Sequence, residues 1–83
     1  MWTVYVLKSL EKRWYYIGST NRLERRVNEH QQKRVRSTKA HVPLLLVYSQ
    51  AFGSEKEARA RERFLKHNRI EKELLIRQIE RGL

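Results

Sequence analysis

Two tyrosines, an arginine, a histidine and a glutamate stand out because together they could hydrolyse a phosphodiester bond. They are Tyr5, Tyr16, Arg26, His30 and Glu62. Such a reaction needs a base that takes a proton from water, positive charge against the phosphate oxygens and a metal ion that neutralises the leaving oxygen. A tyrosine is a poor base at neutral pH because its pKa is about 10. The Arg26 cation, a metal ion or a His30 acceptor could each favour the phenolate.

Arg26 and His30 lie on the face of a helix that should be buried. Leu23, Arg26, Val27 and His30 follow the i, i+3, i+4, i+7 spacing of one helical face. Arginine keeps its proton, and burying it without an anion costs several kcal/mol. Two alternatives remain open: an Arg26 stem that covers apolar surface with its head in water, and a core His30 bonded to a backbone carbonyl. Because both polar groups share one stripe, we favour a functional site.

Glu62 flanks the inward stripe that Ala58 and Leu65 define on a later helix, about 40° from Ala58. It can pair with Lys66 at i+4, which stabilises a solvated helix by about 0.3–0.5 kcal/mol. It can instead give an oxygen ligand to Mg²⁺, which often takes only one or two protein carboxylates beside substrate phosphate. A zinc site is not expected, because the three histidines lie in separate elements and cysteine is absent.

The charge of the chain favours a polyanionic partner. Its 83 residues include 19 Lys and Arg against 9 Asp and Glu, a net charge of +10. Nucleic acid is the first candidate, an anionic membrane surface is less suitable, and a basic protein kept soluble by its charge is the plain alternative. We expect DNA contacts from a basic segment and from the third helix, at Arg22, Arg25, Lys33, Arg34, Arg36, Lys39 and Arg69.

A β-hairpin should position the two tyrosines. Residues 2–8 and 13–18 are rich in β-branched and aromatic residues, which is typical of strands. A symmetric hairpin places Tyr5 directly opposite Tyr16, with both side chains on one face of the sheet.

A helix that carries Arg26 and His30 should follow the hairpin. Thr20 or Asn21 can cap its start, with Glu24 completing a capping box, and it should run to about Lys33. We expect residues 33–41 to form a mobile loop.

The remaining elements are a strand and two helices. The apolar run in residues 42–50 predicts a strand buried on both faces, although Pro43 near its start indicates a strand beginning or an edge. Ser54 and Glu57 form a capping box for the second helix. The third helix should bury Ile70, Leu74, Leu75 and Ile79. We therefore predict one α/β (α+β) domain over residues 1–83, a three-stranded sheet with three helices.

Several strings resemble the GIY-YIG nuclease family. The first tyrosine motif reads TVY at residues 3–5, so the family's glycine and isoleucine are replaced, and the second reads YIG at residues 16–18. Arg26 and His30 follow, and the resemblance continues through LLLVYSQAF and EARARERFLK over nearly the whole chain. The nuclease subunit of bacterial nucleotide excision repair and certain homing endonucleases carry a similar module.

The resemblance implies a three-stranded antiparallel sheet flanked by helices, and metal-dependent cleavage of DNA in repair or recombination. Tyr5, in preference to Tyr16, would act as general base or orient the attacking water. Arg26 would bind the scissile phosphate, and His30 would hydrogen-bond a tyrosine or relay its proton. Glu62 would hold a single Mg²⁺ or Mn²⁺.

Three further expectations complete the prediction. Asn68 stands where family members often have an asparagine after the metal-site helix, so it is a candidate for nucleic-acid contact. The absence of cysteine, of a signal peptide and of a bilayer-length apolar run leads us to expect a cytoplasmic protein without membrane contact. The substrate form stays open between branched and single-stranded DNA. The alternative function is a catalytically silent nucleic-acid-binding or accessory module of a repair complex.

Overall fold

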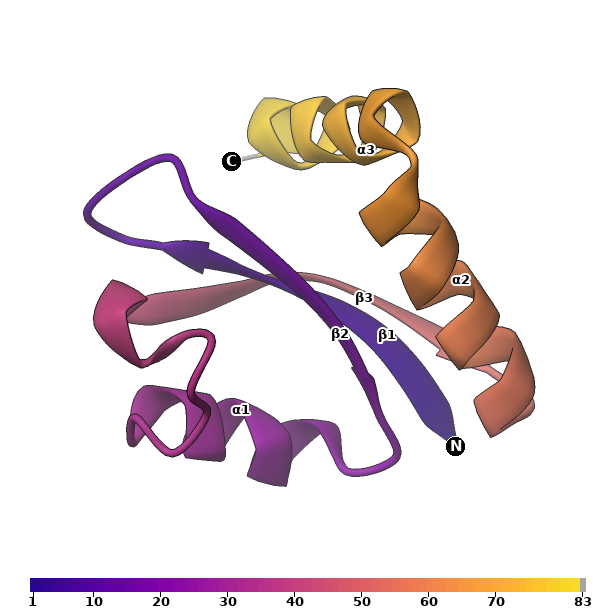
Figure 1. Ribbon diagram of the computed structural model, residues 1–83, viewed down its shortest axis with the longest axis horizontal. Coiled ribbons are helices and arrows are strands. Elements are labelled where there is room, and N and C mark those ends of the chain that lie inside the picture. The colour runs from indigo at the N-terminus through magenta and orange to yellow at the C-terminus, as the bar shows by residue number, and fades with distance from the viewer. Residues whose placement is uncertain (83) are drawn as a thin grey trace.

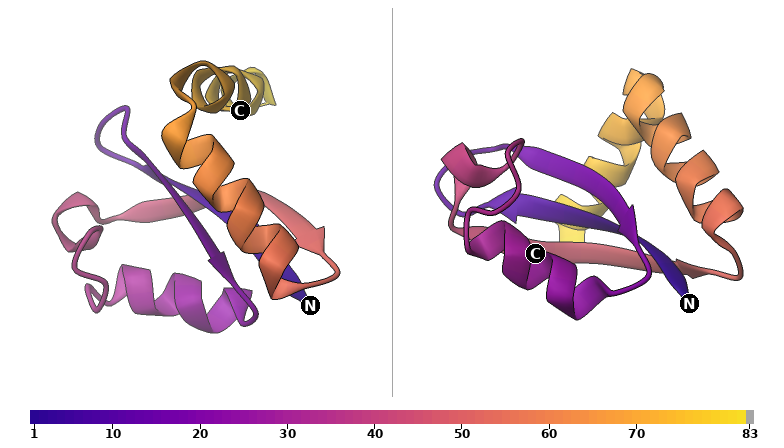
Figure 2. Two further views of the ribbon diagram at one scale, coloured as in Figure 1. Left: turned by 45° about the vertical axis from the view of Figure 1, so that its right-hand side comes forward. Right: turned by 60° about the horizontal axis from the view of Figure 1, so that its bottom comes forward.

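A three-stranded antiparallel sheet forms the centre of the computed structural model, which describes residues 1–82 (Figure 1). Strand β1 is Trp2–Ser9, β2 is Tyr15–Thr20 and β3 is Leu44–Phe52, in the order β2-β1-β3. Helix α1 (Leu23–Gln31) lies against one face of the sheet, while α2 (Glu55–His67) and α3 (Arg69–Gly82) lie against the other (Figure 2). The predicted fold class, a small α+β fold with an antiparallel sheet and three α-helices, is confirmed.

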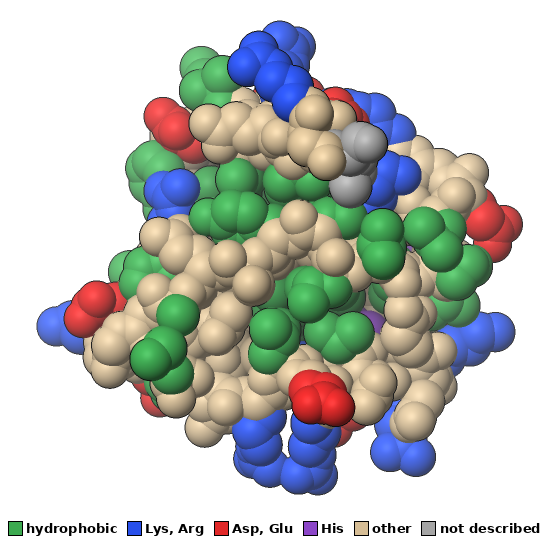
Figure 3. All heavy atoms as spheres, turned by 180° about the vertical axis from the view of Figure 1, so that it is seen from behind, with side chains coloured by type: hydrophobic (Ala, Val, Ile, Leu, Met, Phe, Trp, Pro, Cys, Tyr) green, Lys and Arg blue, Asp and Glu red, His purple; other side chains and the backbone are tan. Residues whose placement is uncertain are grey.

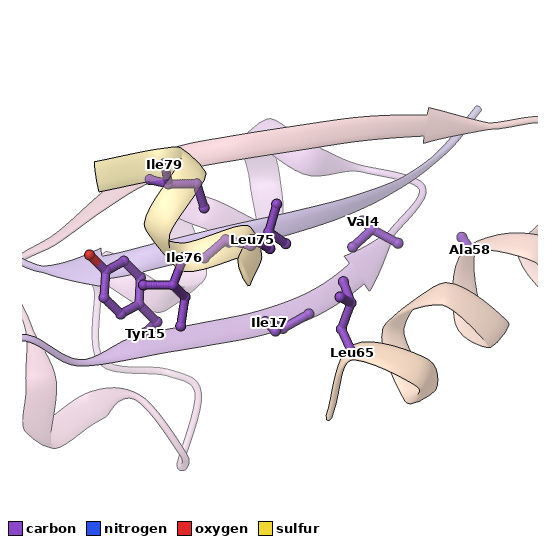
Figure 4. Close-up of a cluster of buried hydrophobic side chains, with 9 residues drawn as sticks. Val4, Tyr15, Ile17, Ala58, Leu65, Leu75, Ile76 and Ile79 are labelled. Carbon is purple, nitrogen blue, oxygen red and sulfur yellow. The ribbon is translucent and has the colours of Figure 1, made fainter. Parts of the chain in front are cut away.

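The central strand is the most buried element. Val4, Tyr5, Val6 and Leu7 are each at most 1% exposed, because β1 has a neighbour on both sides and helices over both faces. Val4 and Val6 face α2 and α3 together with Ile17 of β2 (Figure 4). Tyr5 and Leu7 face α1 instead. Alternation along one strand therefore divides the apolar interior into two clusters, one on each face of the sheet.

The register of the β1–β2 hairpin differs from the symmetric one. Tyr5 pairs with Gly18, and Tyr16 pairs with Leu7, so the prediction of a directly opposed tyrosine pair is wrong. The cause is a longer turn, closed by a bond from Ser9 N to Trp14 O at 2.9 Å. The shift is two residues, which preserves the side of the sheet, and the two tyrosine rings still lie on one face with centroids 6.3 Å apart.

Strand β3 is an edge strand, so the expected burial on both of its faces is wrong. Only Leu44 is buried, and Leu45 and Leu46 are 43% and 38% exposed. The apolar run does not mark the central position, because the hairpin strand β1 occupies it. Hydrophobic side chains are accordingly visible at the surface on the face turned away from the viewer of Figure 1 (Figure 3). Pro43, directly before the strand, agrees with an edge.

Helix α1 starts and ends differently from the prediction. Its N-cap position is Arg22, which makes no side-chain capping bond, so the expected capping box with Glu24 is absent from the described residues. The Thr20 hydroxyl accepts from Arg22 N at 3.0 Å and stabilises the turn before the helix. The helix ends at Gln31, two residues before the predicted Lys33.

The segment after α1 is packed rather than loose. Val35 and Thr38 are buried in it, at 8% and 0% exposure, and a short 3₁₀ helix η1 (Lys39–His41) precedes β3. The predicted loop is therefore present, but its two buried side chains are contrary to the expectation that it is mobile. The side chains of Val35 and Thr38 hold this otherwise basic segment against the rest of the protein.

The predictions for α2 and α3 were each correct in part: in α2 the Glu57 side chain accepts from the Ser54 hydroxyl at 3.3 Å, so the reciprocal half of the capping box is not formed. Ser54 caps α2 by accepting from Glu57 N at 3.2 Å, and Ala58 and Leu65 are buried. In α3 the buried stripe consists of Leu75, Ile76 and Ile79, whereas Ile70 and Leu74 are 74% and 52% exposed. These two residues face away from the sheet. No helix within residues 1–82 is long and apolar enough to cross a membrane.

Candidate functional site

A polar pocket of about 450 Å³ lies at the outer edge of β2, between the start of α1 and the side of α2. Tyr5, Tyr16, Arg26 and Glu62 all line it. His30 does not line the pocket but lies directly behind Tyr5. The structure therefore brings all five predicted catalytic residues to one place, four in the wall and one behind it. The other wall residues are Trp2, Gly18, Ser19, Thr20, Asn21, Arg22, Arg25, Glu29 and Arg59.

Gly18 makes room for the Tyr5 side chain. The two residues are partners in the hairpin, and a Cβ added at Gly18 would lie 2.6 Å from the Tyr5 hydroxyl oxygen and 2.7 Å from Tyr5 Cζ. Real contacts are never that close, so a larger residue would push the phenol away. From the sequence, this glycine was recognised only as the last residue of a predicted strand and of the YIG string. The symmetric register expected from the sequence places Gly18 opposite Thr3, so its contact with Tyr5 could be found only from the actual register.

Tyr5, His30 and Thr38 form a buried chain of hydrogen bonds. Tyr5 Oη lies 2.8 Å from His30 Nε2, and His30 Nδ1 lies 2.8 Å from Thr38 Oγ1. The Thr38 hydroxyl donates to the Val35 carbonyl at 3.4 Å, so its oxygen accepts from Nδ1–H. We therefore assign the proton of the neutral imidazole to Nδ1, which leaves Nε2 to accept from the Tyr5 hydroxyl. Thr38 was missed because it lies in the segment expected to be mobile.

Burial keeps both rings of this chain neutral near pH 7. Burial, with a smaller effect from Tyr16, raises the pKa of Tyr5 to about 12, although the Arg26 guanidinium acts in the opposite direction. Burial, followed by the positive charge of Arg26, lowers the pKa of His30 to about 4. In the resting protein the phenol is thus a donor and the imidazole an acceptor, and the phenolate is not populated.

Arg26 points its charge toward the pocket and is held there by an acid on the same helix. Its Nη1 donates to Glu29 Oε1 at 3.0 Å, and its side chain is 39% exposed. Arg25 also approaches Glu29, at 3.7 Å. The anion that a half-buried Arg26 needs is therefore Glu29, while the exposed part of the guanidinium remains available in the pocket.

Glu62 forms the predicted pair with Lys66 and a second bond that was not predicted. Its carboxylate accepts from Lys66 Nζ at 2.7 Å, the i,i+4 pair, and also from Ser19 Oγ on β2. Burial alone would raise the pKa of Glu62, but the bonds from Lys66 and Ser19 outweigh it and hold the pKa below its usual range. The side chain is an ionised carboxylate in the pocket wall, 19% exposed. Ser19 was not singled out from the sequence, where it follows the YIG string without a distinguishing pattern.

Residues 1–73 match the family model of the GIY-YIG catalytic domain. The chain belongs to the GIY-YIG family. GIY-YIG domains are generally nucleases, so membership indicates a nucleic-acid substrate. Tyr5 and the Tyr16–Gly18 string are the motif residues of this member; Tyr5, Tyr16 and Gly18 line the pocket, and Ile17 packs on the other face of the sheet.

Individual relatives agree with the family match. The chain is 37% identical over 79 residues to a UPF0213 protein of Vibrio campbellii, covering 93% of this chain and 75% of that protein. It is 36% identical to UPF0213 protein YazA of Bacillus subtilis, covering 89% and 76%. The solution NMR structure of UPF0213 protein BH0048 from Bacillus halodurans superposes with a TM-score of 0.58 at 32% identity, covering 94% of this chain and 85% of that one. The names of these relatives specify no activity.

The donor atoms of the GIY-YIG pocket suit a hard divalent cation rather than zinc. Glu62 supplies one ionised carboxylate, and no group of three or more His, Cys, Asp or Glu able to hold a metal occurs within residues 1–82. Mg²⁺ and Mn²⁺ tolerate so few protein ligands because waters and substrate phosphate complete their coordination. The residues present therefore fit a single hard cation, on condition that Lys66 gives up its place on the carboxylate.

The predicted DNA-binding residues lie in four different places in this GIY-YIG domain. Arg22 and Arg25 line the pocket, and with Arg34 they also line a shallow depression along α1. The exposed residues of the segment after α1 lie outside these two sites: Lys33, Arg36 and Lys39. Asn68 has a structural role, because its Oδ1 accepts from Glu71 N at 3.1 Å and caps α3. Arg69 lies at a different groove.

Proposed function

We propose that the protein is a metal-dependent endonuclease that hydrolyses DNA phosphodiester bonds in this pocket. The observation that supports this most is that the phenol of Tyr5, the guanidinium of Arg26 and the carboxylate of Glu62 come from three elements and line one pocket. A pocket built only to bind a phosphate would have no use for an ionised carboxylate in its wall, since that charge repels the ligand.

Arg26 would hold the scissile phosphate and stabilise the charge that develops on its oxygens. Arg22 and Arg25 add positive charge to the same wall. A single Mg²⁺ or Mn²⁺ at Glu62 would neutralise charge on the leaving oxygen.

Tyr5 would position the attacking water. Because its hydroxyl proton points to His30 Nε2, the lone pairs of the phenol oxygen are left to accept a hydrogen bond from water in the pocket. The raised pKa of Tyr5 and the low pKa of His30 favour this positioning role over a standing phenolate base. His30 and Thr38 fix the direction of the phenol.

Cleavage assays test the proposal. Purified protein is incubated with supercoiled, branched and single-stranded DNA, with Mg²⁺ or Mn²⁺ and in parallel with EDTA, the branched form representing repair and recombination intermediates. We expect metal-dependent nicking that is lost in Glu62→Gln and Arg26→Gln. The matched control is Lys56→Gln, an exposed residue of α2 outside the pocket. DNA binding by the wild-type protein without metal-dependent nicking would overturn the proposal in favour of a catalytically silent binding module.

A further inference from the structure

A second groove, of about 350 Å³, follows the edge of β2 away from the pocket toward α3. We call it the basic groove, and Trp14, Lys66, Arg69 and Lys72 line it. Lys66 connects the two sites, because its ammonium bonds Glu62 of the pocket at 2.7 Å and lies 5.3 Å from the centre of the Tyr16 ring. A strand that leaves the pocket along β2 would therefore pass into this groove.

The charge of the basic groove is available to a ligand. Arg69 and Lys72 form no ion pair within residues 1–82. Its acid, Glu73, is already paired with Arg13 at 2.7 Å and with Arg77 at 3.4 Å. The two unpaired cations lie on the first turn of α3, three residues apart and thus on one side of the helix. This is the electrostatic character expected of a site for backbone phosphates.

Trp14 gives the groove an aromatic side chain, which packs with the cluster on the α1 face of the sheet and meets the groove at the edge of β2. One face of its ring is stacked on His41, with centroids 3.7 Å apart and planes at 9°. His41 Nδ1 is buried and has no hydrogen-bond partner in the described part of the chain, so the imidazole contributes a ring to the stack rather than a polar contact. Tyr16 lies two residues further along the chain on the same face of the sheet, 6.4 Å from Trp14, and leads toward Tyr5 in the pocket.

We propose that the basic groove binds an unpaired DNA strand next to the scissile phosphate, with Arg69 and Lys72 on its phosphates and Trp14 against a base. A positive groove with aromatic side chains is the usual composition of single-strand sites. In a duplex the faces of the bases are covered by their neighbours, so a contact with the Trp14 ring is open only to an unpaired strand. The inference rests on the proposed function, because the DNA strand would enter the basic groove from the pocket that holds the scissile phosphate.

Binding measurements in EDTA test this inference without any cleavage. Fluorescence anisotropy compares a labelled single-stranded oligonucleotide with a blunt duplex of the same sequence. The double variant Arg69→Gln/Lys72→Gln should bind both more weakly and reduce the slope of log K against log salt for the single strand by about 1.4. Its control is Lys56→Gln/Arg81→Gln, which removes the same charge from exposed sites on α2 and α3 that line neither the pocket nor the basic groove. Equal affinities of the two double variants would overturn the inference.

The Trp14 contact has its own readout. Trp14→Leu should weaken single-strand binding about fivefold or more, which corresponds to the loss of one base stack, and should leave duplex binding within about twofold. Because this change also removes the stack on His41, thermal unfolding is measured alongside, and Trp14→Phe should restore much of the affinity. In Trp2→Phe, where Trp14 is the only tryptophan left, the oligonucleotide should quench the fluorescence. No quenching at saturation, or an equal loss for duplex and single strand, would refute the contact.

The two proposals can fail separately. Absence of nicking with intact, Trp14-dependent single-strand binding would refute the nuclease function and leave the strand site standing. Nicking that is indifferent to Trp14, Arg69 and Lys72 would refute the strand site alone.

Discussion

The phenol of Tyr5 lies directly over Gly18, its partner on the neighbouring strand, at a distance that only a residue without a Cβ permits. This contact directs the Tyr5 hydroxyl to His30 Nε2 and forms the inner wall of the pocket. Gly18 of the YIG string is thus needed at the site because it has no side chain, and not because of its backbone conformation.

Replacing this glycine should damage both stability and activity. A Cβ at Gly18 would meet Tyr5 Oη at 2.6 Å, and overpacking of this kind costs about 1–3 kcal/mol. We expect Gly18→Ala to lower the free energy of unfolding by that amount and to reduce nicking, as measured by thermal unfolding and by DNA cleavage. The control is Gly53→Ala, where a Cβ would meet no described atom within 4 Å. Equal behaviour of the two alanine variants would show that the Tyr5–Gly18 contact is unimportant.

Thr38 should decide which nitrogen of His30 carries the proton. Thr38→Val keeps the shape of the side chain but leaves His30 Nδ1–H without a partner in a fully buried place, which costs about 1–3 kcal/mol. We expect the proton to move to Nε2, so that Tyr5 loses its acceptor. NMR chemical shifts of the two His30 nitrogens report the tautomer, and Thr38→Ser, which retains the hydroxyl, should resemble the wild type. An unchanged tautomer in Thr38→Val would contradict the hydrogen-bond directions assigned to Tyr5, His30 and Thr38.

The buried His30 should make the fold sensitive to acid. Its pKa is about 4 in the folded protein against 6.5 when unperturbed, so the unfolded state binds the extra proton as the pH falls. Its contribution to stability is present above pH 6.5 and is lost between pH 6.5 and 4, on the order of 2 kcal/mol. Urea unfolding at several pH values should show this decline, and His30→Gln should flatten it over that range. A decline of the same size in the glutamine variant would assign it to other groups.

A metal ion should bind at Glu62. We expect small amounts of Mn²⁺ to broaden the amide NMR signals of Ser19 and Glu62 first, because their side chains meet at the pocket wall. Glu62→Gln should abolish this broadening, whereas Glu55→Gln, on the exposed first turn of α2, should not. Broadening centred on Glu55 and Glu57 instead would place the ion outside the pocket.

Much of the site followed from local patterns in the sequence. The helical spacing predicted that Arg26 and His30 share a face, because it is a property of a single element. The shared face of Tyr5 and Tyr16 was predicted from a symmetric hairpin, and it was correct because the actual register differs by two residues, which keeps the side of the sheet. The exact partner of each residue did not follow. The five-residue turn between Ser9 and Tyr15 set a register that no local pattern specifies.

The residues missed from the sequence act across the fold. Ser19 is recognisable only by its bond to Glu62, 43 positions later, and Thr38 only by its bond to His30. The misjudged burial of β3 has a related cause, since an apolar run does not state which strand will be central. Side chains whose role depends on a distant partner required the structure.

The central claim is that Tyr5, Arg26 and Glu62 act together on one phosphodiester. The most direct test is the nicking rate of supercoiled DNA by wild type, Arg26→Gln, Glu62→Gln and the double variant, with Mn²⁺ in excess. Residues that act as a unit lose activity non-additively. We therefore predict that the double variant is no slower than the slower single variant. Losses that multiply, or a wild-type protein that does not nick DNA with Mn²⁺, would contradict the claim.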